Sequence, residues 1–180
     1  MVIPTQTLLF LSSLIYAATA ASVPRVPEAP EGLVVLAQET VDDGAGVLTF
    51  YGDADPTAAD RREASGLSKR CGSNQVSCFS SHRAPVWICS ELLYQMEKSS
   101  TQLKQSPRSI CKSTNGKQCC ISWAKAVSGG KENNLSSAGY KVASECNIWG
   151  DGTVSGLTRD TQIGNTCTTQ CLSNRPDGCE

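Results

Sequence analysis

Apolar positions repeat at helical spacing in two segments of the chain. In residues 85–98 they fall on one face of a helix, and proline at position 85 suits a first turn, where its missing N–H has no helical partner to lose. The spacing recurs after Gly129-Gly130, where Asn133 or Asn134 can cap a helix that runs to Cys146. We therefore predict two amphipathic helices. Their apolar stripes are Val86, Cys89, Leu93 and Met96 in the first, and Leu135, Ala138, Val142 and Cys146 in the second.

Short apolar runs around these helices predict strands. Residues 76–79 form one, and residues 109–114 and 117–123 flank Asn115-Gly116, a dipeptide that favours a two-residue hairpin turn because both positions must reach positive φ. A last strand is predicted within residues 162–172. The order β-α-β-β-α-β indicates an α+β fold. It is a two-layer sandwich of the ferredoxin-like, split βαβ type, with both helices on one face of an antiparallel sheet.

Cysteine content adds a covalent framework to this domain. The chain has 180 residues, ten cysteines and one histidine, and every cysteine lies in residues 71–180. This density is typical of secreted disulfide scaffolds, and the even number allows five bridges without a leftover thiol. Neighbouring strand residues point to opposite faces, so Cys119 and Cys120 are expected to have different partners. The spacing of zinc ligands occurs only at Cys167 and Cys171, so we expect no metal site. The predicted bridge cysteines are Cys71, Cys78, Cys89, Cys111, Cys119, Cys120, Cys146, Cys167, Cys171 and Cys179.

The first twenty residues have the pattern of a signal peptide. A short apolar run over residues 8–16 is followed by Ala18-Thr19-Ala20, the small-x-small pattern of a signal-peptidase site. The run is about half of the ~20 residues that span a bilayer, which argues against a membrane anchor. We therefore predict cleavage after Ala20 and secretion to the extracellular space.

Residues 21–70 differ in composition from both neighbours. They contain no cysteine and are acidic, with five Lys or Arg against nine Asp or Glu. We predict a largely unstructured pro-segment, although each of two apolar patches, residues 33–36 and 47–51, has the composition of a strand. The segment ends in Lys69-Arg70, directly before the first cysteine, and kexin-type proteases recognise such dibasic pairs. Arg61-Arg62 is a weaker second candidate. Cleavage after Arg70 gives a mature protein of residues 71–180.

Several stretches of the cysteine-rich part carry a family resemblance. Residues 70–78 read RCGSNQVSC, residues 106–111 read SPRSIC, residues 119–123 read CCISW, and residues 167–176 read CTTQCLSNRP, followed by Gly178-Cys179. Together they resemble the small secreted fungal proteins whose domain is called WD-like, a name that implies no WD40 propeller. More loosely, the cysteine content, processing and α/β architecture are similar to the killer toxins of smut fungi and to plant-pathogen effectors. The resemblance implies no catalytic or binding residues.

The sequence lacks a recognisable catalytic set. His82 is the only histidine, so histidine-based triads and dyads lack parts, and cysteines held in bridges leave no thiol nucleophile. We expect no catalytic residue, no cofactor and no metal. The net charge of −1 gives no indication of nucleic-acid binding. A small secreted hydrolase or ribonuclease stays as an alternative, in which His82, a glutamate and Arg108 would share the roles of acid, base and phosphate ligand.

Other residues suit a binding surface. Trp87 lies off the apolar stripe of the first helix and Trp149 lies in a Gly-Asp-Gly loop, so both are candidate exposed contacts, whereas Trp123 is in phase with the core. Asn134 begins a glycosylation sequon at a helix start. Five cations near the first helix and the hairpin form either a patch for anionic membranes or glycans, or an ordinary solvated face. They are Lys98, Lys104, Arg108, Lys112 and Lys117.

Two functions from different classes fit these features. The first is a secreted, non-enzymatic fungal factor, toxin- or effector-like, that binds an unknown protein, glycan or membrane-surface target. The second is a structural or cell-surface component of the fungus itself. In both cases a kexin-type protease is the expected processing partner.

Overall fold

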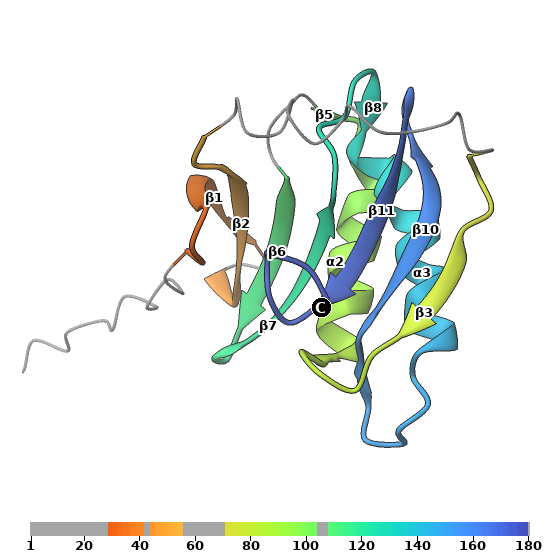
Figure 1. Ribbon diagram of the computed structural model, residues 1–180. Helices are drawn as coiled ribbons and strands as arrows, with labels where there is room; N and C mark the ends of the chain where they lie inside the picture. Colours follow the sequence, from red (N-terminus) through yellow and green to blue (C-terminus); the bar gives the residue numbers. More distant parts are fainter. Residues whose placement is uncertain (1–28, 42–43, 56–70, 104–107, 180) are drawn as a thin grey trace, which may run out of the picture.

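The computed structural model describes residues 29–41, 44–55, 71–103 and 108–179 (Figure 1). Within these residues seven strands pair in one antiparallel sheet, in the order β1-β2-β6-β7-β11-β10-β3. The strands are β1 (Leu33–Val41), β2 (Gly46–Asp53), β3 (Gln75–Cys78), β6 (Ser109–Thr114), β7 (Lys117–Trp123), β10 (Gly156–Ile163) and β11 (Thr166–Ser173). The helices are α2 (Val86–Lys98) and α3 (Ser136–Glu145), with a 3-10 turn at Glu132–Leu135.

Two short strand pairs connect the helices to the sheet. They are β4 (Ala84–Pro85) with β9 (Thr153–Val154), and β5 (Gln102–Leu103) with β8 (Gly130–Lys131). Neither helix of the described part is long and apolar enough to cross a bilayer. The signal-peptide prediction, with Ala20, and the processing pair Lys69-Arg70 both lie outside the described residues.

The elements with the strongest local signals are confirmed. The predicted helix over 85–98 is α2, with Pro85 as its N-cap residue, and the second predicted helix is α3. Strands β6 and β7 coincide with the two predicted arms of the hairpin. Its turn residues Asn115 and Gly116 have φ values of 50° and 71°, as that turn requires.

The ferredoxin-like strand order is not confirmed. The sheet is larger and fully antiparallel, and β3 lies at one edge beside β10. Where one last strand was predicted, the chain makes the hairpin β10–β11. Strand β10 was not predicted because its sequence is polar. Its residues Thr158 and Thr161 are nevertheless buried, and the Thr161 hydroxyl donates a hydrogen bond of 2.7 Å to the Thr158 hydroxyl. Hydrogen bonds from both neighbouring strands stabilise a segment that its own residues do not mark as a strand.

The prediction of a largely unstructured pro-segment is wrong for residues 33–41 and 46–53. These residues form the hairpin β1–β2, and β2 pairs with β6 from Val47 opposite Ser113 to Tyr51 opposite Ser109. The cause is burial, since β2 places Leu48 in the core on the helix side and Tyr51 in a cluster on the opposite side. The apolar residues of β2 become buried only when it pairs with β6, a strand far along the chain. Local sequence does not reveal such a distant partner.

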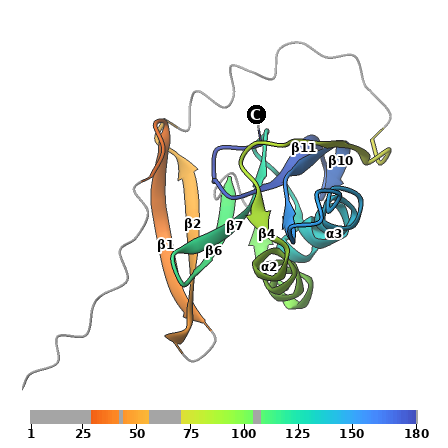
Figure 2. The same ribbon diagram turned by 90° about the horizontal axis from the view of Figure 1, so that it is seen from below.

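Both helices cover one face of the sheet, and the main core lies between these layers (Figure 2). A disulfide joins Cys89 of α2 to Cys119 of β7, and another joins Cys146, directly after α3, to Cys78 of β3. The helices also approach each other closely at Gly139, where a Cβ atom would collide with Leu93. Each helix is therefore fixed to the sheet covalently, as the cysteine positions in the two apolar stripes suggest.

The opposite face of the sheet is covered in part by the C-terminal segment of the chain. Cys120 of β7 bonds to Cys111 of β6 on this side, so the adjacent cysteines of β7 have different partners, as predicted. The chain end folds back onto the face through the Cys171–Cys179 bridge, and Cys71–Cys167 fixes the segment before β3. All ten cysteines lie in the described residues and none is free, which confirms the five-bridge framework.

The hairpin allows a stability prediction. Leu48 is 6% exposed and Val34, in the same hairpin, is 41% exposed. Leu48→Ala should lower the free energy of unfolding of the full chain by ~2–5 kcal/mol, because it leaves a cavity in the core. Val34→Ala should change it by less than about 0.5 kcal/mol. Urea unfolding followed by tryptophan fluorescence measures both. Equal, small effects would mean that β2 does not share the core.

Candidate functional site

The described residues contain no group of three or more His, Cys, Asp or Glu side chains placed to hold a metal ion. His82 precedes β4 with a positive φ of 52°, and its carbonyl accepts a hydrogen bond of 2.8 Å from the Asn174 N–H. This contact ties the loop before α2 to the end of β11. The observed role of the His82 backbone is therefore structural.

Two of the five predicted cations are held inside the fold. The Lys112 side chain is 1% exposed and points toward α2, where its Nζ lies 3.0 Å from Glu91 Oε2. Arg108 is also mostly buried, and its Nη1 lies 2.7 Å from Asp53 Oδ2 of β2. Because each cation is engaged in an ion pair within the fold, the predicted cationic patch is wrong for both residues.

The other predicted cations come from separate parts of the chain. Lys98 lies at the end of α2 with its Nζ 5.3 Å from the centre of the Tyr94 ring, a cation–π contact. Lys117 is exposed at the start of β7, beside the hairpin turn. Lys104 lies outside the described residues. For Lys98, Lys104 and Lys117 the cationic surface stays a prediction.

The three tryptophans have different environments. Trp123 is buried in the core, as predicted. Trp149 is half-buried under Arg83, whose guanidinium lies 5.2 Å from the ring centre and pairs with Asp151 at 2.7 Å. That carboxylate accepts hydrogen bonds from the hydroxyl and N–H of Thr153, which together with Arg83 hold the pKa of Asp151 below its usual range. Trp149 is thus part of a loop cluster.

Asn134 has a structural contact at the predicted glycosylation position. Its Oδ1 accepts a hydrogen bond of 2.8 Å from the Lys131 N–H and so caps the 3-10 turn before α3. A glycan on the Asn134 nitrogen would have to leave this capping contact intact.

One surface does gather exposed aromatic side chains: the outer side of the helix layer. Trp87 and Tyr94 lie seven residues apart on α2, about 10.5 Å along its axis, and are 47% and 58% exposed. Tyr140 of α3 is 38% exposed, and its hydroxyl donates a hydrogen bond of 3.2 Å to Glu97 Oε2 of α2. We call Trp87, Tyr94 and Tyr140 the aromatic helix face. Sequence reasoning found Trp87 but missed both tyrosines, because Tyr140 reaches this surface only through helix packing.

Electrostatics keep the Tyr140 phenol in its neutral form. Desolvation raises the pKa of Tyr140 above its ordinary value of 10.0, and the hydrogen bond to Glu97 raises this pKa further. A deprotonated phenol would lose its donor hydrogen and would lie against the Glu97 carboxylate. The phenol therefore stays a hydrogen-bond donor that orients Glu97 between the two helices.

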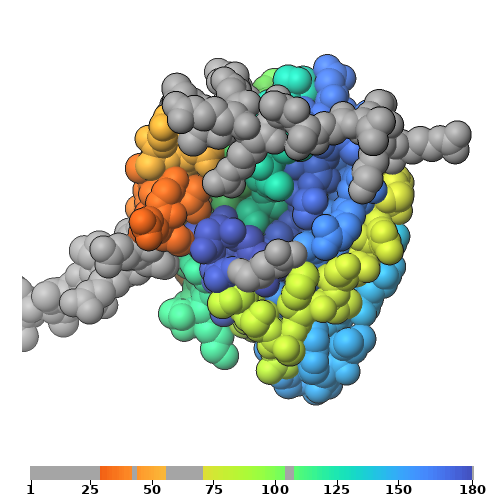
Figure 3. Space-filling view, in the orientation of Figure 1, coloured from red at the N-terminus to blue at the C-terminus, as the bar shows by residue number. Residues whose placement is uncertain are grey.

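On the opposite face a hollow lies between the start of β1 and the chain end. Figure 3 shows both of these segments on that face. The hollow has a volume of about 530 Å³, and its lining mixes Asp53 and Arg108 with Glu31, Arg159 and Asp177. Three of its charges are compensated by ion pairs, since Asp53 pairs with Arg108 within the lining and Asp177 pairs with Arg175 beside it. Such a lining selects no single ligand charge.

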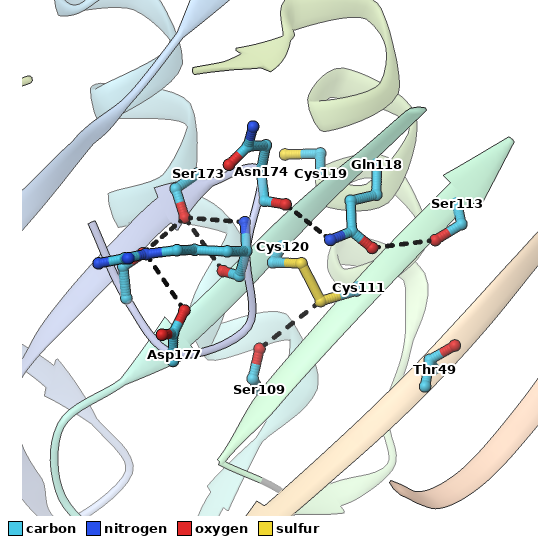
Figure 4. The surroundings of a disulfide bond; sticks show 12 residues. Thr49, Ser109, Cys111, Ser113, Gln118, Cys119, Cys120, Ser173, Asn174 and Asp177 are labelled. Atoms are coloured by element: carbon cyan, nitrogen blue, oxygen red, sulfur yellow. Dashed lines mark hydrogen bonds and ion pairs between the residues drawn. A yellow bond between two sulfur atoms is a disulfide. The ribbon is translucent and has the colours of Figure 1, made fainter. Parts of the chain in front are cut away.

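The chain end is held near the Cys111–Cys120 bridge by polar side chains (Figure 4). The Gln118 amide donates to the Asn174 carbonyl at 2.7 Å, while its oxygen accepts a hydrogen bond from Ser113. The Ser173 hydroxyl bonds to the Gly178 carbonyl at 2.8 Å. These groups fasten the C-terminal segment to the sheet. We take the aromatic helix face as the candidate recognition surface, because it gathers large exposed side chains from two helices.

Comparison with known proteins identifies one family. The model of the family described as Fungal WD-like matches residues 47–179, from β2 to the last cysteine. No curated protein and no solved structure matches the chain.

The Tyr140–Glu97 contact predicts a measurable pKa change. Glu97→Gln removes the negative charge beside Tyr140, so the pKa of Tyr140 should fall while staying above 10.0, because desolvation is the larger cause. Ultraviolet titration of the phenols, with Tyr140→Phe to identify the signal, measures this shift. An unchanged titration in Glu97→Gln would show that the contact is absent in solution.

Proposed function

The chain belongs to the fungal WD-like family, and on that premise we propose that it is a small secreted protein, toxin- or effector-like and non-enzymatic, that binds a protein on the surface of a target cell. The aromatic helix face is the recognition surface. Its three large side chains stand exposed on two neighbouring helices, and this observation carries the proposal.

Exposed aromatic residues support protein binding on energetic grounds. Tryptophan and tyrosine are enriched among the few interface residues that dominate binding free energy, since each buries a large area and loses few rotatable bonds. Here they also have polar neighbours, because Lys98 contacts Tyr94 and Glu97 contacts Tyr140. A partner surface can therefore bury the rings and satisfy the adjacent charges.

The disulfide framework supports both secretion and rigid presentation. Five bridges form and persist in oxidising compartments, which agrees with a secreted product. The Cys89–Cys119 bridge fixes α2 to the centre of the sheet and so fixes Trp87 and Tyr94 in place. A rigid surface loses little conformational entropy on binding, and a small interface then reaches a useful affinity.

A direct binding experiment tests the proposal. Fluorescent full-chain protein should bind saturably to living fungal or plant cells, and the Trp87→Ala/Tyr94→Ala double variant should bind at least ~30-fold more weakly, because the loss of even one hot-spot residue costs ~2 kcal/mol or more. The control is Ile148→Ala, which truncates an apolar side chain that is 67% exposed after α3. Its affinity should stay within about threefold of wild type. Equal weakening of both variants would refute recognition through the aromatic helix face.

The same cells separate the alternative functions. Treating the cells with protease should abolish saturable binding if the target is a protein. Binding that survives protease and stays with the wall fraction would instead support the wall-component alternative.

The non-enzymatic assignment gives a second prediction. His82→Ala should leave cell binding and growth inhibition within a few-fold of wild type, because neither effect requires a titrating group. A true general base contributes roughly 10²–10⁴-fold to a rate, so the two outcomes are well separated. A hundred-fold loss of growth inhibition in a folded His82→Ala protein would favour the hydrolase alternative.

A further inference from the structure

Strand β2 is embedded in the sheet although it belongs to the segment before the dibasic pair. Its two faces are both buried, with Leu48 on the helix side and Thr49 and Tyr51 on the other. On the helix side Leu48 joins the main core, and on the other Tyr51 packs with the Cys111–Cys120 bridge. The family match also begins inside β2, which makes this strand part of the domain.

Polar contacts reinforce the junction between β2 and β6 at both of its ends. At one end Asp53 pairs with Arg108 at 2.7 Å, and the Arg108 N–H donates to the Tyr51 carbonyl at 2.7 Å. At the other end the Thr114 hydroxyl donates to the Ala45 carbonyl at 2.7 Å. The hairpin is thus clamped along the full length of β6.

No disulfide joins this hairpin to the rest of the molecule. All ten cysteines pair within residues 71–179. The only chain connection runs from Asp53, near one edge of the sheet, to Gln75 at the opposite edge, and Lys69-Arg70 lies within it. A cut there breaks none of the strand pairs described above, and the Cys71–Cys167 bridge still holds the new chain start.

We propose that the β1–β2 hairpin is a separable strand donor. After cleavage at Lys69-Arg70 it stays docked on β6, and the protein persists as a noncovalent complex of two chains. The strand-accepting site consists of the β6 edge with the side chains of Ile110, Cys111 and Arg108. Without the donor, β6 would present unpaired backbone groups and would uncover Lys112, which is now buried against Glu91 beside Leu48. This inference goes beyond the proposed function and concerns a different surface.

In vitro cleavage of the purified full chain tests this inference. A kexin-type protease should cut the folded protein after Arg70, and the two chains should then co-elute in gel filtration. Without reductant, denaturant should separate them, and intact mass should identify each chain. A chain that the protease leaves uncut, loss of the hairpin during gel filtration, or chains that stay joined in denaturant would each overturn the proposal.

Matched variants in the hairpin make the test specific. Leu48→Ala should weaken retention of the cleaved hairpin by at least ~30-fold, as expected for loss of a buried leucine. Val34→Ala removes a comparable, exposed side chain of the same hairpin and should change retention less than about threefold. Asp53→Ala should also weaken retention, since it removes the ion pair between β2 and Arg108. Equal retention of all three would contradict docking through β6. No cell-surface target is needed, so this result is independent of the proposed function.

Discussion

The structure depends on the central strand β7, whose adjacent cysteines form disulfides on opposite faces of the sheet. Cys119 binds α2 through Cys89, and Cys120 binds the neighbouring strand β6 through Cys111. Because neighbouring side chains of a strand point in opposite directions, two consecutive residues connect three elements. The position of α2, and with it the aromatic helix face, follows from the first bridge. The position of β6, and with it the docking of the hairpin, follows from the second.

The aromatic helix face and the docking site of the hairpin lie on different surfaces of the molecule. The helix side presents Trp87, Tyr94 and Tyr140 to the solvent, held over a core that disulfides fix. The edge of β6 receives the hairpin through backbone pairing and the Asp53–Arg108 ion pair. A partner bound to the helices therefore need not disturb the hairpin. The chain combines a helix layer that disulfides fix, which is the proposed recognition surface, with a strand pair that no disulfide fixes.

Local sequence patterns predicted the elements that are stabilised locally. The stripe of α2 and the Asn115-Gly116 turn rest on short-range spacing, and the complete pairing of the cysteines rests on their even number; all three are confirmed. Contacts between distant residues decide the rest. The sequence indicates a surface cation at Lys112, but this side chain lies inside the fold and pairs with Glu91. Tyr140 joins the exposed aromatic residues of α2 only because α3 packs beside α2. The acidic composition around β2 likewise masked an apolar strand whose partner lies beyond the dibasic pair.

Amide hydrogen exchange on the intact, uncleaved chain tests the central claim most directly, namely that the segment before the dibasic pair is part of the cooperative sheet. The amides of residues 48–51 that pair with β6 should exchange as slowly as those of β7, because both strands open only with the core. Exchange of residues 48–51 at the rate of a free peptide, while β7 stays protected, would contradict the account.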